Sequence, residues 1–172
     1  MNRVRWAVET LDPRPDELLL EIGCGPGVAV GAVCQRLAGG RIVAIDRSAT
    51  AIGRAGRRNA EHVAAGRAVL RVAALEELEP ADLLGEGERF DKVFAMNVNL
   101  FWVRSPRREL DLVRRLLRPG GALYLFYGYD GASQPAGAAR IPEALTGHLA
   151  EAGYEVEVRT AGSQLAVVAT PG

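Results

Sequence analysis

The sequence predicts an α/β fold in one domain, with an open, mostly parallel β-sheet and helices on both faces. Short apolar runs alternate with longer segments of helical periodicity along most of the chain, which is the order of elements that builds parallel sheets. The last two apolar runs, YEVEVRT and QLAVVAT, are separated only by an Ala-Gly-Ser turn and indicate a closing antiparallel hairpin. No repeat, low-complexity tract or linker interrupts the 172 residues, so we expect residues 1–172 to form a single domain.

Glycine, proline and polar residues mark where the strands and helices should begin and end. The first helical segment after a strand ends at a Gly-Gly pair, and the segment before the fifth strand ends at Pro-Gly-Gly. Ser48 and Ser105 precede helical segments and are expected N-caps. Residues 80–88 hold only a short apolar pair, which predicts a single turn or a loop. We expect strands at 18–22, 41–45, 68–72, 90–96 and 123–127, and helices at about 28–38, 49–64, 106–117 and 142–152.

Charge and composition favour a small-molecule partner. The 21 acidic residues balance 21 basic ones, so no overall field attracts nucleic acid or an anionic membrane surface. The start, MNRVRWAVETLDP, lacks the apolar core of a signal peptide, and no run reaches the roughly 18 apolar residues of a membrane span. We therefore expect a cytoplasmic protein. Cys24 and Cys34 are the two cysteines, and their spacing indicates neither a disulfide framework nor a metal site.

The stretch LLLEIGCGPGVAVGAVCQRLAGGRIVAID, residues 18–46, predicts a ligand-binding loop. Gly23, Gly25 and Gly27 follow the first expected strand at alternate positions. Glycine permits positive φ and lets backbone N–H groups approach a ligand, and the start of the following helix favours an anionic group. Ligands of open α/β sheets bind at the carboxyl ends of the strands, where this loop falls. A plain turn would not require three glycines in this arrangement.

The spacing of the glycines separates three classes of ligand. A P-loop requires a lysine after its last glycine, and none lies near this turn. A dinucleotide fingerprint G-x-G-x-x-G would place its third glycine at position 28, which is Val28 here. An acidic residue, Asp46, follows Gly27 at about the 20-residue distance at which such folds bind a ribose. Because nicotinamide enzymes also use an acid there, an NAD(P)-dependent oxidoreductase stays the alternative.

Beyond this loop, EIGCGPG followed by IVAID resembles the first motif, [DE]-x-G-x-G-x-G, of the class I S-adenosylmethionine-dependent methyltransferases. FDKVFAMNVNLFW resembles the fourth strand of that family and the cofactor-lining loop after it, and LVRRLLRPGGALYLF resembles its helix, glycine turn and fifth strand. The resemblance covers nearly the whole chain. It implies a Rossmann-like seven-stranded sheet, S-adenosylmethionine as cofactor and methyl transfer to a small-molecule acceptor by in-line displacement. A non-catalytic S-adenosylmethionine-binding module is a further alternative.

The resemblance also implies which residues bind the cofactor. The backbone from Gly23 to Gly27 would contact the methionine part, Glu21 would neutralise or orient its ammonium group, and Asp46 would accept both ribose hydroxyl protons. The cofactor-binding residues expected in full are Glu21, Gly23, Cys24, Gly25, Gly27, Asp46, Arg47, Ala74, Leu75, Asn97 and Val98.

The sequence departs from the family pattern after the third strand. A common Gly-Asp pair that reads the adenine edge is replaced by Ala73 and Ala74. Packing of Leu75 and backbone hydrogen bonds, or substitution by Glu76, would then have to hold the adenine.

The acceptor side is less defined, because methyl transfer requires no dedicated acid or base and depends on holding the reactants in near-attack geometry. Pockets combine aromatic walls with a few polar groups, so residues after the fourth and fifth strands are the candidates. Core packing for Phe101 and Trp102, and sheet capping for the two tyrosines, are the competing interpretations. The acceptor candidates are Asn99, Phe101, Trp102, Tyr127, Tyr129 and Asp130.

Other chemistries receive less support. Nothing marks a partner base for Cys24, so a structural thiol is favoured over a nucleophile. The arginines between 104 and 118 are interrupted by Glu109 and Asp111, which favours a solvated helix face over a phosphate-binding strip. Related methyltransferases commonly carry a lid before the first strand, where this chain has roughly 17 residues. We expect the cleft to be open, or to be covered by the second subunit of a homodimer.

Overall fold

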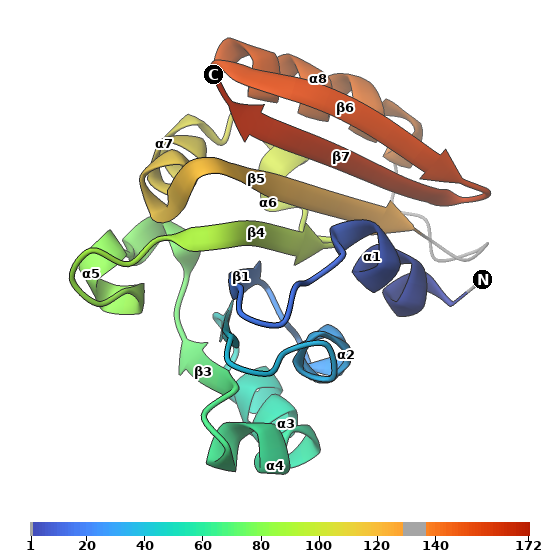
Figure 1. The fold of residues 1–172 in the computed structure, drawn as a ribbon. Helices are drawn as coiled ribbons and strands as arrows, with labels where there is room; N and C mark the ends of the chain where they lie inside the picture. Colours follow the sequence, from blue (N-terminus) through green and yellow to red (C-terminus); the bar gives the residue numbers. More distant parts are fainter. Residues whose placement is uncertain (1, 129–136) are drawn as a thin grey trace.

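The computed structural model describes residues 2–128 and 137–172, whose strands form one seven-stranded sheet (Figure 1). The strand order is β3-β2-β1-β4-β5-β7-β6. The first five strands pair in parallel, whereas β7 is antiparallel to both β5 and β6. The predicted fold class, including the closing hairpin, is confirmed. The strands are β1 Leu18–Ile22, β2 Arg41–Asp46, β3 Ala68–Val72, β4 Phe90–Met96, β5 Leu117–Gly128, β6 Tyr154–Ala161 and β7 Gln164–Pro171.

Helices cover both faces of the sheet, and each face has its own apolar core. Val8 of α1 and Val30 of α2 are buried on one face, and Leu110 of α7 is buried on the other. Successive residues of a strand point to opposite faces, so Leu19 joins the first core and Leu20 the second. The helices are α1 Arg3–Leu11, α2 Val28–Cys34, α3 Ala49–Arg58, α4 Ala60–Ala64, α5 Pro80–Leu83, α6 Leu100–Val103, α7 Arg107–Leu116 and α8 Ile141–Glu151, with 3-10 turns η1 Leu75–Glu77 and η3 Ala138–Arg140.

Parallel pairing brings the carboxyl ends of four strands to one edge of the sheet. Ile22 at the end of β1 is paired with Ile45 of β2 and with Ala95 of β4. Asp46 at the end of β2 is paired with Val72 of β3. The loops that follow these strands therefore meet along the edge where open α/β sheets bind ligands.

Helix α1 has no counterpart in the sequence-based prediction. The side-chain Oδ1 of Asn2 accepts hydrogen bonds from the N–H groups of Val4 and Arg5, at 3.0 and 3.2 Å, and so caps the helix. Ala7 and Leu11 are buried among the apolar residues of α2 and the sheet. The apolar residues of this segment, Val4, Trp6, Ala7, Val8 and Leu11, include positions at helical spacing, so the helix was missed although its pattern is present in the sequence.

The predicted helix at 49–64 is interrupted at Asn59. The Asn59 side chain is buried, and its Nδ2 donates to the carbonyl groups of Ala55 and Gly27, at 3.0 and 2.9 Å. Because asparagine competes for backbone acceptors in this way, α3 ends at this residue and α4 begins after it.

The remaining helix and strand ends follow the predictions in part. Ser48 is an N-cap as predicted, with its Oγ accepting from the Ala51 N–H at 3.2 Å. The prediction for Ser105 is wrong, because Pro106 takes the position before α7 and no side chain caps that helix. Within residues 80–88, the first four form the expected single turn, α5. The Pro-Gly-Gly turn falls within β5, since Leu117 already pairs with Phe90 before the register shifts.

Candidate functional site

The glycine loop joins β1 to α2 at the carboxyl edge of the sheet. The N–H groups of Gly23 and Cys24 both donate to the carbonyl of Ile45, at 2.8 and 3.0 Å, so the loop is fixed to the end of β2. Gly23, Gly25 and Gly27 all have positive φ, which side chains rarely adopt. The backbone conformation thus requires glycine at each position.

The three glycines face different surroundings. A Cβ at Gly23 would lie 2.7 Å from Cγ2 of Val98, and one at Gly27 would lie 2.8 Å from Cβ of Ala55 in α3. A Cβ at Gly25 would meet nothing within 4 Å. Gly27 therefore permits close packing of α2 against α3, whereas Gly25 presents a bare backbone to open space.

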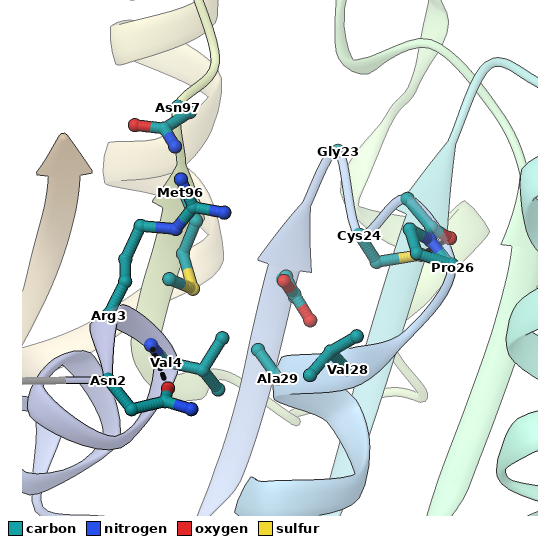
Figure 2. A pocket seen from close by; sticks show the side chains of 12 residues that line it. Asn2, Arg3, Val4, Gly23, Cys24, Pro26, Val28, Ala29, Met96 and Asn97 are labelled. Atoms are coloured by element: carbon teal, nitrogen blue, oxygen red, sulfur yellow. Dashed lines mark hydrogen bonds between the residues drawn. The ribbon is translucent and has the colours of Figure 1, made fainter. Parts of the chain in front are cut away.

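That open space is a pocket of about 570 Å³ (Figure 2). The glycine loop forms one wall, and the start of α1 and the end of β4 form the other. Val4, Val28 and Met96 supply apolar surface. Five of the predicted cofactor residues line this pocket: Glu21, Gly23, Cys24, Gly25 and Asn97.

A second pocket of about 280 Å³ adjoins the first. The two pockets share three lining residues, Gly23, Met96 and Asn97. They therefore adjoin each other at the carboxyl ends of β1 and β4. The structure thus brings ten of the eleven predicted cofactor residues to one cleft, all except Gly27. The predicted residues that line only the second pocket are Asp46, Arg47, Ala74, Leu75 and Val98.

Glu21 is a buried carboxylate without a hydrogen-bonding partner. Its side chain is 2% exposed, and Oε2 has no partner among the described residues. Burial, and to a lesser degree the charge of Asp46, raise the pKa of Glu21 to about 8. A buried acid of this kind is stabilised when a cation binds beside it.

Asp46 accepts hydrogen bonds from two backbone groups. Its Oδ2 accepts from the Gly25 N–H at 2.8 Å and its Oδ1 from the Ser48 N–H at 2.9 Å. The carboxylate therefore connects the glycine loop with the start of α3. Each oxygen keeps a second lone pair, so this structural role leaves capacity for a ligand in the second pocket.

Asn97 connects the ends of β4 and β5. It has φ +54°, and its side chain exchanges two hydrogen bonds with the backbone of Gly128, at 3.2 and 3.0 Å. The buried Tyr127 donates its hydroxyl proton to the Val98 carbonyl at 2.7 Å. Tyr127 thus lies beneath the loop after β4 and lines neither pocket, and its hydroxyl supports the cofactor side of the cleft.

The adenine-side candidates surround the second pocket. Leu75 is buried, and Ala73, Ala74 and Leu75 line the pocket together. Glu76 forms an ion pair with Arg47 at 3.2 Å across its rim.

The acceptor-side candidates do not form one cluster. Asn99 is exposed, and its Oδ1 accepts from the Trp102 indole N–H at 3.3 Å. Phe101 is buried in the core, in agreement with the packing interpretation. Trp102 lines a separate pocket with His148 and Arg140, of about 330 Å³. Tyr129 and Asp130 lie outside the described residues.

The structure assigns packing and surface roles to the other groups considered. Burial raises the pKa of Cys24 to about 12 and that of Cys34 to about 11, which favours inert thiols. Four arginines of the strip contact other groups of the protein: Arg104 pairs with Glu109, Arg115 with Glu79 and Arg118 with Asp91, while Arg114 lies over the ring of Tyr154.

Two classes of feature are absent from the described part of the chain. None of the helices in residues 2–128 and 137–172 combines the length and the apolar character that crossing a bilayer requires. Within the same ranges, no cluster of three or more His, Cys, Asp or Glu residues could hold a metal ion.

Comparison with known sequences adds to this geometry. Residues 19–121 match the family profile described as "Methyltransferase domain". The matched segment begins in β1 and ends in β5. It therefore contains the glycine loop, Asp46 and the carboxyl ends of the strands β1 to β4 beside the two pockets. A curated relative, an uncharacterized 37.1 kDa protein in transposon TN4556 of Streptomyces fradiae, is 34% identical over 119 residues. The match covers 69% of this chain but 32% of that protein, so the chain spans about a third of its relative.

Solved structures share the fold. A SAM-dependent methyltransferase from Aquifex aeolicus aligns with a TM-score of 0.75 and 13% identity, over 96% of this chain and 88% of that one. The glycopeptide N-methyltransferase MtfA aligns with a TM-score of 0.73 and 16% identity, over 99% of this chain and 91% of that one. At this identity the likeness concerns the fold.

Proposed function

This chain belongs to the methyltransferase-domain family, and on that premise we propose that it binds S-adenosylmethionine in the two adjoining pockets and transfers the methyl group to a small molecule. One observation carries the proposal. The pockets meet at Gly23, and each contains a carboxylate suited to a different end of that cofactor. Glu21 faces the first pocket and Asp46 the second.

The first pocket suits the amino-acid end. Gly25 offers backbone without a side chain in the way, and the unpaired Oε2 of Glu21 would accept from an ammonium group. A bound cation favours the ionised form of Glu21 and so would lower its pKa from about 8. Binding would therefore give a partner to Oε2 of Glu21, which has none among the described residues.

The second pocket suits the adenosine end. The free lone pairs of Asp46 would accept from ribose hydroxyl groups while its two backbone contacts hold it in place. Leu75, Val98 and Leu100 offer apolar surface for a planar base. This packing would substitute for the Gly-Asp pair that the sequence lacks.

The protein's part in the reaction is to bind and orient. When bound, S-adenosylmethionine supplies an electrophilic methyl group, which passes to a nucleophilic atom of the acceptor as the carbon–sulfur bond breaks. Asn97 and Tyr127 hold the loop after β4 against the cofactor pockets through the Gly128 and Val98 backbone. Such positioning contributes to rate by presenting the reactants in line. The acceptor, a homodimer and a cytoplasmic location stay predictions.

The test is a calorimetric titration of the purified protein with S-adenosylmethionine, S-adenosylhomocysteine and NADH. We expect saturable binding of the two adenosyl sulfur compounds and none of NADH, because Val28 stands where a dinucleotide loop has its third glycine. Binding of NADH without a response to S-adenosylhomocysteine would overturn the proposal in favour of an oxidoreductase.

A further inference from the structure

Arg3 lies at the first pocket, although nothing in the sequence pattern marks it. It belongs to the first turn of α1, and its side chain reaches toward Met96 and Asn97 on the side of the pocket opposite Cys24 and Pro26 (Figure 2). Among the described residues that line this pocket, Arg3 and Glu21 are the two with charged side chains.

The guanidinium group is held in place and keeps donors available. Nη1 donates to the Gly128 carbonyl at 3.1 Å, and Asn97 Nδ2 donates to the same carbonyl at 3.2 Å. An arginine has five N–H groups, and among the described residues Gly128 is the acceptor that Arg3 reaches. The Asn2 cap and the buried Ala7 and Val8 hold α1 in place, and the hydrogen bond to Gly128 holds the guanidinium group at the pocket.

Arg3 and Glu21 do not neutralise each other. The ion pairs of the described residues do not join them, and Oε2 of Glu21 is unpartnered. A pocket with one fixed cation and one buried acid, held apart, is complementary to a zwitterion. Its ammonium group would meet Glu21, and its carboxylate would meet the guanidinium, which binds carboxylates in a planar, often bidentate geometry.

We propose that Arg3 is a specificity-determining residue that binds the carboxylate of the cofactor's amino-acid end, opposite the ammonium site at Glu21. The inference rests on the proposed function and adds a second charge contact to it. It assigns α1 a direct part in cofactor selection, in addition to its packing on the sheet. An acceptor carboxylate has the same chemistry, and the experiment below distinguishes the two sources.

The experiment compares S-adenosylhomocysteine with its decarboxylated analogue, 5′-deoxy-5′-(3-aminopropylthio)adenosine, in the wild type and in Arg3→Met. Both ligands keep the ammonium group and the adenosine. We expect the wild type to bind the decarboxylated ligand at least about tenfold more weakly, as the loss of one charged hydrogen-bonded pair implies. In Arg3→Met this ratio should fall close to one, and in Arg3→Lys it should be intermediate.

Arg5→Met is the matched control. Arg5 lies in the same helix turn, is exposed and pairs with Glu9, and it does not line the first pocket. Its ratio should equal that of the wild type. Because the ratio is measured within each variant, general loosening of α1 weakens both ligands and cancels.

The outcomes separate the two proposals. If the wild type binds both ligands equally, or if Arg3→Met and Arg3→Lys keep the full ratio, Arg3 does not bind the cofactor carboxylate and serves as an anchor or an acceptor contact. If the wild type binds neither ligand, the proposed function itself fails.

Discussion

Glu21 and Asp46 are carboxylates near the ends of neighbouring parallel strands, yet their surroundings differ. Asp46 has two backbone N–H groups within 2.9 Å, whereas Oε2 of Glu21 has no partner among the described residues. The pKa of Glu21 is accordingly raised to about 8 by burial and by the nearby Asp46. Backbone donors, more than position on the sheet, thus decide whether an acid at this edge is satisfied within the protein or depends on a ligand.

The largest effect on cofactor binding is expected from a substitution at Gly25, which contacts Asp46 and shares a pocket with Glu21. Gly25 donates its N–H to Asp46 and lines the pocket of Glu21. In Gly25→Val, the branched side chain would occupy the open space at this position, so we expect no measurable binding of S-adenosylhomocysteine by calorimetry.

Gly66→Val is the control for Gly25→Val. Gly66 also has positive φ and open space around its Cβ position, but it lies before β3 and lines neither pocket. Both variants should lose similar thermal stability, since both force a side chain into the left-handed region. Unchanged affinity in Gly25→Val would show that the loop is only a turn.

Removing Asp46 should give the next largest effect. In Asp46→Ala we expect S-adenosylhomocysteine to bind about 2 to 4 kcal/mol more weakly, taking each of two charged hydrogen bonds at about 1.5 to 3 kcal/mol and allowing for water that replaces the carboxylate. A 2′-deoxy analogue should lose much less affinity on the same substitution, because one ribose contact is already absent. Calorimetric titration of both ligands measures the difference.

Ser48→Ala accompanies Asp46→Ala as a control. It removes the N-cap of α3 next to Asp46 without removing the carboxylate. It should lower stability by about 1 kcal/mol and leave affinity unchanged. If Asp46→Ala resembles Ser48→Ala, losing stability but binding both ligands normally, Asp46 is a structural cap.

Glu21 should make cofactor binding dependent on pH. Below a pKa of about 8 the free protein holds a proton on Glu21, and an ammonium ligand would displace it. The affinity for S-adenosylhomocysteine should therefore rise between pH 6 and 8, by up to about tenfold per pH unit, with release of about one proton at pH 7. Calorimetry in buffers of different ionisation enthalpy counts the protons. Glu21→Gln should abolish the release, and a wild type that releases none would contradict the ammonium site.

The smallest effect concerns stability without ligand. Because the folded-state pKa of Glu21 is raised from 4.5 to about 8, its stabilising contribution is complete below pH 4.5 and is lost as pH rises toward 8. The loss is at most about 1.4 kcal/mol per pH unit. Urea unfolding of the wild type and of Glu21→Gln between pH 5 and 8.5 should show a smaller decline in the variant. Parallel curves would mean that the Glu21 pKa is near its ordinary value.

The glycine loop and the two carboxylates could be predicted from the sequence because their arrangement is local. Gly23, Gly25 and Glu21 lie within five residues, and Asp46 ends the next strand of a regular βαβ unit. The pattern could not show that the glycines have different surroundings. Gly27 lies against Ala55 because α3 packs there, and a ligand could have taken that place if α3 packed elsewhere. The packing of α3 is a tertiary contact that the local glycine pattern does not specify.

The roles of residues that depend on contacts with distant parts of the chain could not be predicted from the sequence. Arg3 reaches the pocket through a hydrogen bond to Gly128, 125 positions away. The direction of the Tyr127 hydroxyl depends on the course of the loop at Val98, so an acceptor contact and a structural contact could not be distinguished from the strand pattern. Arg3 was missed because α1 was not predicted, although Val4, Ala7, Val8 and Leu11 follow helical spacing.

The strand order has a consequence for synthesis. β7 is made after β6 but lies between β5 and β6, and β6 pairs with β7. During translation the edge of β5 therefore has no pairing strand until residues 164–171 have been synthesised. At a translation rate of about 5 to 20 residues per second, this takes a few seconds. An unpaired strand edge is a site for pairing with other chains. In that interval the growing sheet has an open edge at β5, which closes when β7 is inserted.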